Sequence, residues 1–117
     1  MERVIVRWDS TEDSMDARVL AGEGDISVQR CKRLDGMWGE PEVSWYSGKG
    51  DGKDVREFAM GLLEASMIAD EMGGSIKVYC MVIEGKDGFD TMHVAATSYE
   101  MAKRSVPTGW KCVGEPV

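Results

Sequence analysis

The dipeptide Asp35-Gly36 constrains the fold most, because it separates two strand-like runs, residues 26–34 and 37–46. Asp-Gly between such runs predicts a β-hairpin with a two-residue type I′ turn, and the turn fixes which residues pair. The apolar face of this hairpin is predicted to hold Ile26, Val28, Leu34, Met37, Val43 and Trp45. The other face is polar, as expected of a sheet covered on one side only.

Asp87-Gly88 is a second turn signal of the same kind, between residues 75–83 and 90–97. The register that it predicts pairs Met81 with Val94. Residues 75–83 are apolar on both faces of the strand. That composition is typical of a strand that is buried on both sides or covered by a partner.

Between the hairpins, apolar residues recur at spacings of three and four from Asp54 to about Met72, which predicts an amphipathic helix. Asp54 is the expected N-cap, with Glu57 as its capping-box partner. Gly73 suits the left-handed position that follows the last helical turn. The face toward the sheet is predicted to hold Val55, Phe58, Ala59, Leu62, Ala65, Ala69 and Met72.

Two N-terminal strands (residues 4–8 and 17–21) and a short final helix, capped near Thr97 and reaching Arg104, complete the prediction. We expect a single α+β domain over residues 1–117. It would contain an antiparallel sheet of five or six strands, one main helix on one face, and a short C-terminal helix. A chain of 117 residues is long enough to bury such a core without a metal or disulfide.

Composition narrows the classes of partner. Fourteen Lys and Arg against twenty-one Asp and Glu give a net charge of −7, which repels nucleic acid and anionic membranes. The longest apolar run, residues 78–83, is too short to cross a bilayer, and no signal-peptide pattern is present, so we expect a cytoplasmic protein. The three cysteines lack the paired spacing of zinc ligands, which favours free thiols over a site built with His93.

The loop 47–54, SGKGDGKD, raises the question of phosphate binding, because it joins a predicted strand to a predicted helix. A Walker A loop requires glycine where Ser47 stands and a hydroxyl residue where Asp54 stands. A dinucleotide-binding loop requires glycine where Lys53 stands. The loop is therefore interpreted as a flexible connector, with no cofactor expected.

Catalysis has few candidate residues. His93 is the only histidine, and in the predicted register it lies diagonally across from Cys80 on one sheet face. A nucleophilic pair also requires an orienting acid, which the sequence does not identify. We expect no enzyme activity. The alternative is a small ligand-binding or nucleotide-binding domain or enzyme that uses loop 47–54 or the Cys80/His93 face.

A second apolar stripe lies on the predicted helix, away from its main stripe, and it is the first candidate partner-binding surface. It consists of Arg56, Met60, Leu63 and Met67. Methionine-rich apolar patches adapt to varied partners, although Trp110 in the C-terminal tail is an alternative cover. The second candidate surface holds Val78 and Val82.

We therefore expect a small acidic protein-binding module that works through surface contacts as an inhibitor or adaptor. Its partner would be another protein or a second copy in a homodimer. Size and charge alone liken it to accessory proteins of phages and mobile elements.

Overall fold

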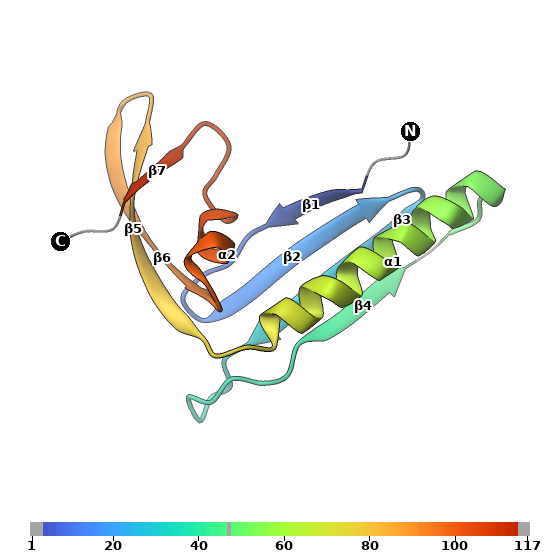
Figure 1. Ribbon diagram of the computed structural model, residues 1–117, viewed down its shortest axis with the longest axis horizontal. Helices are drawn as coiled ribbons and strands as arrows, with labels where there is room; N and C mark the ends of the chain where they lie inside the picture. Colours follow the sequence, from blue (N-terminus) through green and yellow to red (C-terminus); the bar gives the residue numbers. More distant parts are fainter. Residues whose placement is uncertain (1–3, 47, 115–117) are drawn as a thin grey trace.

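The computed structural model describes residues 4–46 and 48–114, and Ser47 of the loop lies outside this range. The first half of the chain forms a four-stranded antiparallel sheet in the order β1-β2-β3-β4. A long helix, α1 (Gly52–Met72), lies along one face of this sheet (Figure 1). The strands are β1 (Ile5–Trp8), β2 (Ser14–Ala21), β3 (Gly24–Cys31) and β4 (Glu42–Tyr46). We call this unit the body.

The second half forms a three-stranded antiparallel sheet in the order β6-β5-β7, which we call the arm (Figure 1). Its strands are β5 (Lys77–Gly85), β6 (Gly88–Ala96) and β7 (Lys111–Gly114), with the short helix α2 (Tyr99–Lys103) beside them. The α+β class, the antiparallel pairing and both helices are confirmed. In the described part of the chain, seven strands divide between two sheets, whereas one sheet of five or six strands was expected. Strand β7, which follows Trp110 in the C-terminal tail, was not among the predicted elements.

The predicted register of the first hairpin is confirmed within its strands. Ile26 pairs with Trp45, and Val28 pairs with Val43. Ile26 and Val28 are fully buried under α1, so they face the helix as expected, whereas Trp45, predicted on the same face, is 61% exposed. The side-chain alternation was therefore sufficient to fix which face of β3 meets the core.

The tight turn predicted at Asp35-Gly36 is wrong. Strand β3 ends at Cys31, and the chain returns through a wider turn in which the carboxylate of Asp35 accepts a hydrogen bond from the Met37 backbone N–H (2.9 Å). Backbone hydrogen bonds from Arg33 N to Met37 O (2.7 Å) and from Gly36 N to Arg33 O (2.9 Å) close a loop of three residues in place of the predicted two. Leu34 and Met37 are consequently exposed and do not belong to the apolar face.

The second hairpin differs from its prediction by two residues. Gly85 pairs with Gly88, so the loop is Lys86-Asp87, and Met81 pairs with Met92. Because strand side chains alternate with a period of two, this shift leaves every side chain on its predicted face.

The ends of α1 also differ from the prediction. Asp51 is the N-cap, and Asp54 is its partner in the capping box. Gly73 has a right-handed conformation (φ −73°), so the left-handed ending predicted for it is wrong. Instead, the Arg30 guanidinium of β3 donates hydrogen bonds to the carbonyl oxygens of Met72 (2.7 Å) and Gly74 (2.9 Å). The bond to Met72 satisfies a carbonyl group that the helix end leaves free, and the bond to Gly74 holds the chain that follows.

Small residues bring α1 close to the sheet. Gly61 and Ala65 are buried at the contact, and a Cβ added at Gly61 would lie 2.6 Å from the Cβ of Ala21. Val55 and Ala59 were expected on this face, but they are exposed. Helical spacing alone placed them at its margin, where the narrow sheet no longer covers the helix.

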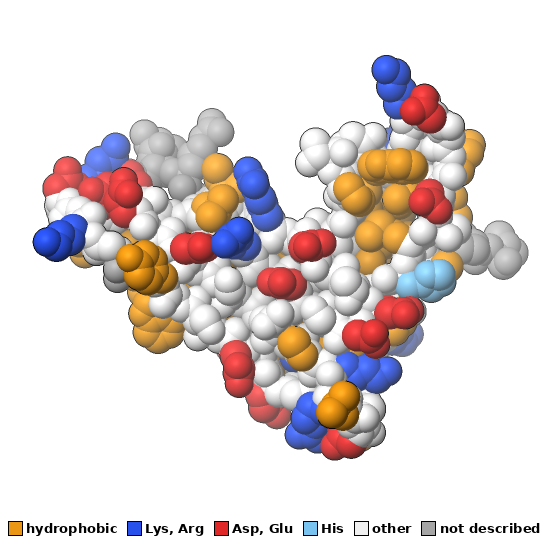
Figure 2. All heavy atoms as spheres, turned by 180° about the vertical axis from the view of Figure 1, so that it is seen from behind, with side chains coloured by type: hydrophobic (Ala, Val, Ile, Leu, Met, Phe, Trp, Pro, Cys, Tyr) orange, Lys and Arg blue, Asp and Glu red, His pale blue; other side chains and the backbone are white. Residues whose placement is uncertain are grey.

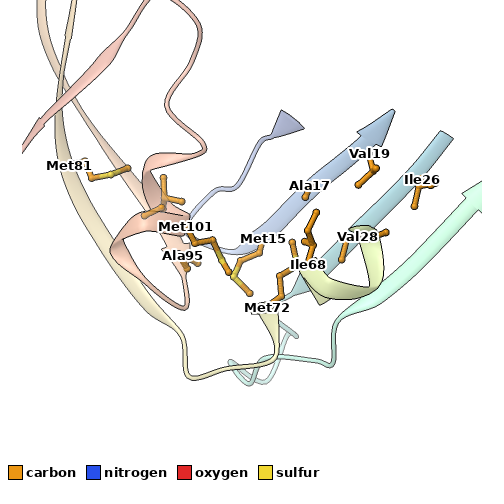
Figure 3. Packing of buried hydrophobic residues seen from close by; sticks show 14 residues of the cluster. Met15, Ala17, Val19, Ile26, Val28, Ile68, Met72, Met81, Ala95 and Met101 are labelled. Atoms are coloured by element: carbon orange, nitrogen blue, oxygen red, sulfur yellow. The ribbon is translucent and has the colours of Figure 1, made fainter. Parts of the chain in front are cut away.

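Body and arm meet at a joint formed by Met15, Met72 and Met101, which are buried and point toward one another (Figure 3). Hydrogen bonds from Ser10 N to Ser105 Oγ (3.1 Å) and from Ala95 N to Thr11 O (2.8 Å) also cross this joint. From the joint the two sheets diverge (Figure 1), and the molecule measures 51 × 38 × 18 Å. Its radius of gyration, 15.7 Å, exceeds the roughly 13 Å typical of a domain this long.

Candidate functional site

The stripe of Arg56, Met60, Leu63 and Met67, which we call the outer stripe, faces away from the sheet on α1. The exposed fractions are 48% for Met60, 64% for Leu63 and 58% for Met67. Within residues 4–46 and 48–114, the tail does not cover these side chains. Trp110 lies over Gly85 on the arm instead, with its ring 2.9 Å from where a Cβ at Gly85 would be. The structure therefore leaves a continuous apolar line exposed on the main helix.

Opposite charges stand at the two ends of the outer stripe. Arg56 lies one turn before Met60, and Asp70 lies one turn after Met67. Neither charge forms an ion pair with the described residues, whereas neighbouring Glu71 binds the Arg104 guanidinium (2.9 and 3.0 Å). Both end charges are consequently free to contact a partner.

The arm carries a second exposed apolar surface. Val78 and Phe89, on the same face of the arm sheet, are exposed by 51% and 70%. Val82 lies between them and is half-buried. The opposite face of β5 contains Met81 and Ile83, which are buried. Hydrophobic side chains gather on the arm, whereas charged ones are scattered over the body (Figure 2). The apolar composition of β5 on both faces thus corresponds to one covered face and one open face.

The start of α1 is occupied by its own side chains. Asp51 Oδ1 accepts a hydrogen bond from Asp54 N (2.9 Å), and Asp54 Oδ2 accepts one from Asp51 N (3.0 Å). The hydrogen bond from Asp54 N is the main cause that lowers the pKa of Asp51. A phosphate at this helix end would have to displace both carboxylates and overcome their negative charge.

A hollow of about 220 Å³ adjoins this loop, lined in part by Lys49, Val55 and Phe58. Ligand pockets usually enclose about 300–1,000 Å³, so this hollow is small for a nucleotide. Strand β4, which precedes the loop, is an edge strand of an antiparallel sheet. Phosphate-binding loops of the Walker and dinucleotide types belong to parallel βαβ units.

Cys80 and His93 lie directly opposite each other in the arm, closer than the diagonal placement expected from the sequence. His93 is exposed, and Cys80 is half-buried. In the described part of the chain, no carboxylate binds His93, so the orienting group of a catalytic pair is missing. Cys31, Cys80 and Cys112 are all free, and no three potential metal ligands gather within residues 4–46 and 48–114.

A charged depression on the body was not found from the sequence. Arg7, Asp9, Asp16 and Arg18 line a hollow of about 380 Å³ on the sheet face opposite α1. Partial burial, and then the nearby Asp9 charge, raises the pKa of Asp16. The sequence signal was available in β2, where Met15, Ala17 and Val19 alternate with charged residues, but the acidic residues before it favoured a loop. Two acids and two bases neutralise one another here, so the hollow has no selective charge.

No family model, curated protein or solved structure matches this chain. No helix within the described residues is both long and apolar enough to cross a lipid bilayer. Three places on the molecule are candidate sites: the outer stripe, the open arm face and the loop before α1. The first two are exposed apolar surfaces, whereas the amides of the third already have acceptors.

Proposed function

We propose that this protein is a cytoplasmic protein-binding module of the inhibitor or adaptor type that acts through the outer stripe of α1. The observation that carries the proposal is the exposure of Met60, Leu63 and Met67 by about half or more along one line of the main helix. Contiguous exposed apolar surface favours contact with a partner, and methionine adapts to differently shaped surfaces. The partner is another protein or a second copy of this chain.

The exposed arm face supports the same proposal. Val78, Val82 and Phe89 would provide a second contact surface, separate from α1. A sheet face in contact with water alone is normally polar, whereas this one places Val78, Val82 and Phe89 among polar residues such as His93. Two apolar surfaces on one small protein suit an adaptor, which contacts more than one surface at a time.

Two further features favour contact over catalysis. The amides of Asp51 and Asp54 at the start of α1 have carboxylate acceptors, and His93 forms no ion pair with an acid among the described residues. The three free cysteines fit the reducing environment of the cytoplasm.

The test is the double substitution Met60→Glu with Met67→Glu. Two charges on the outer stripe should abolish partner capture or self-association and leave the far-UV circular dichroism spectrum unchanged, because neither side chain belongs to the core. The matched control is Leu34→Glu with Met37→Glu, which adds the same two charges at exposed apolar positions away from α1. The proposal is wrong if the Met variant sediments and captures the same proteins as the unchanged chain.

A further inference from the structure

We propose that the outer stripe binds a second copy of this chain, with the two α1 helices antiparallel and the two-fold axis at Leu63. This inference rests on the proposed function, in which the outer stripe is the contact surface. It adds the identity of the partner and the geometry of the contact.

The pattern of residues along α1 supports this pairing. Arg56, Met60, Leu63, Met67 and Asp70 follow one another at alternating spacings of four and three. This is the spacing of the seam by which two helices pack in a coiled coil. The seam is apolar at its centre, positive at its first residue and negative at its last.

The seam is complementary to itself only when it is reversed. Leu63 lies midway between Arg56 and Asp70 in the sequence. In an antiparallel pair, Leu63 therefore lies against Leu63 of the second copy. Arg56 of each copy lies against Asp70 of the other, so the charge pair forms twice. A parallel copy would place Arg56 against Arg56 and Asp70 against Asp70, and like charges across an interface are unfavourable. Antiparallel helices also oppose their dipoles favourably.

The molecule as a whole exposes more surface than a typical monomer of its mass. The chain exposes 7740 Å², whereas a typical monomer of its mass, 12.9 kDa, exposes roughly 6,300 Å². The difference, about 1,400 Å², exceeds the roughly 800 Å² that each partner buries in a standard interface. The body is one sheet and one helix thick, so pairing through α1 would form a four-layered sheet–helix–helix–sheet arrangement.

The test is a charge exchange measured by analytical ultracentrifugation over a range of concentrations. The single variants Arg56→Asp and Asp70→Arg each place like charges opposite one another twice and should raise the dimer Kd by about tenfold or more. The double variant restores opposite charges and should return the Kd to near its original value. A double variant as weak as the singles, or an unchanged chain that is monomeric at all concentrations, would overturn the inference.

Crosslinking locates the axis. In a Cys31→Ser background, Leu63→Cys should form a covalent dimer with a short bis-maleimide, because the two thiols face each other. Met60→Cys is the matched control and should crosslink poorly, because its counterpart lies about two helical turns away along the antiparallel helix. Efficient crosslinking at Met60 and none at Leu63 would contradict the antiparallel arrangement.

The two proposals fail differently. If the unchanged chain is monomeric but Met60→Glu with Met67→Glu still loses a captured protein, the second copy is wrong and the binding module stands. If the chain is monomeric and capture is also unchanged, both proposals are wrong.

Discussion

The body and the arm are both antiparallel sheets with one face packed under a helix, but their opposite faces differ in composition. Each sheet has one apolar face under a helix. The opposite face of the body carries Arg7, Asp16, Arg18 and Ser27. The opposite face of the arm is mixed, with the exposed apolar residues Val78 and Phe89 beside Glu84, Thr91 and His93. Water solvates the polar face of a sheet, whereas an apolar face is stabilised when another element or molecule buries it. The arm, unlike the back of the body, therefore exposes large apolar side chains to solvent.

The covers of the two sheets differ as well. The body lies under the 21 residues of α1, while the arm is covered by the five residues of α2 and by Trp110 over Gly85. The arm therefore depends more on the joint, where its Met101 meets Met15 and Met72 of the body.

The largest expected loss of stability comes from a substitution at the joint, where body and arm pack together. Met72→Ala should lower the free energy of unfolding by about 2–5 kcal/mol, because Met72 is fully buried and its removal leaves a cavity. Urea denaturation followed by circular dichroism measures this loss. Met37→Ala, at an exposed methionine, is the control and should change it by less than about 0.5 kcal/mol. Equal losses in both variants would show that the joint does not unite body and arm.

The next effect concerns the body alone. Gly61→Val should cost about 1–3 kcal/mol, because its side chain would overlap Ala21 and Ile26 and push α1 from the sheet. Ala59→Val on the exposed side of α1 shows the effect of a valine that overlaps nothing. Valine forms helices better than glycine, so propensity alone would stabilise Gly61→Val. Thermal unfolding of the two variants measures the difference. If Gly61→Val is as stable as Ala59→Val, the close contact is not a determinant of body stability.

The open face of the arm should tolerate substitution. Val78→Thr with Phe89→Thr should change the free energy of unfolding by less than about 0.5 kcal/mol, because both side chains are exposed and threonine suits strands. Binding of a fluorescent dye specific for apolar surface should fall. Ser27→Thr on the polar face of the body should leave dye binding unchanged. A large loss of stability in the arm variant would mean that this face is covered.

The smallest effect lies at the start of α1. The pKa of Asp51 is lowered from its ordinary value of 3.8, chiefly by the hydrogen bond from the Asp54 backbone. A lowered carboxylate pKa contributes stability that is fully present above 3.8 and is lost as pH falls through the lower folded value. Asp51→Asn retains a good N-cap without the charge, so its Tm deficit relative to the unchanged chain should shrink in acid. A Tm difference independent of pH would contradict the role of the Asp51 charge.

The sequence predicted those parts of the fold whose signals are local. The pairing of Val28 with Val43 and the end of α1 near Met72 follow from alternation and helical spacing. The division into two sheets could not be predicted. The apolar residues on both faces of β5 indicate that this strand is packed against other elements, but they do not identify those elements. Strand β7 was missed since four residues at the chain end carry no periodic signal.

The candidate site shows the same limit. Helical spacing alone predicted that Met60, Leu63 and Met67 share a line opposite the core, while only the path of the tail could show that they are exposed. Asp35 and the Lys86-Asp87 loop show that turn residues predict a reversal of the chain more reliably than the register. The shift of two residues in the second hairpin preserved both faces, so the predicted surface at Val78 and Val82 was unaffected.

The contiguous layout of the two units has a consequence for biosynthesis. All elements of the body precede residue 73, and all strands of the arm follow residue 76. The body therefore leaves the ribosome first, and for a few seconds at usual rates of translation it exists without the arm. During that interval Met15 and Met72 lack the cover of Met101. The nascent chain then presents an apolar end at the joint, which closes only when α2 has been synthesised.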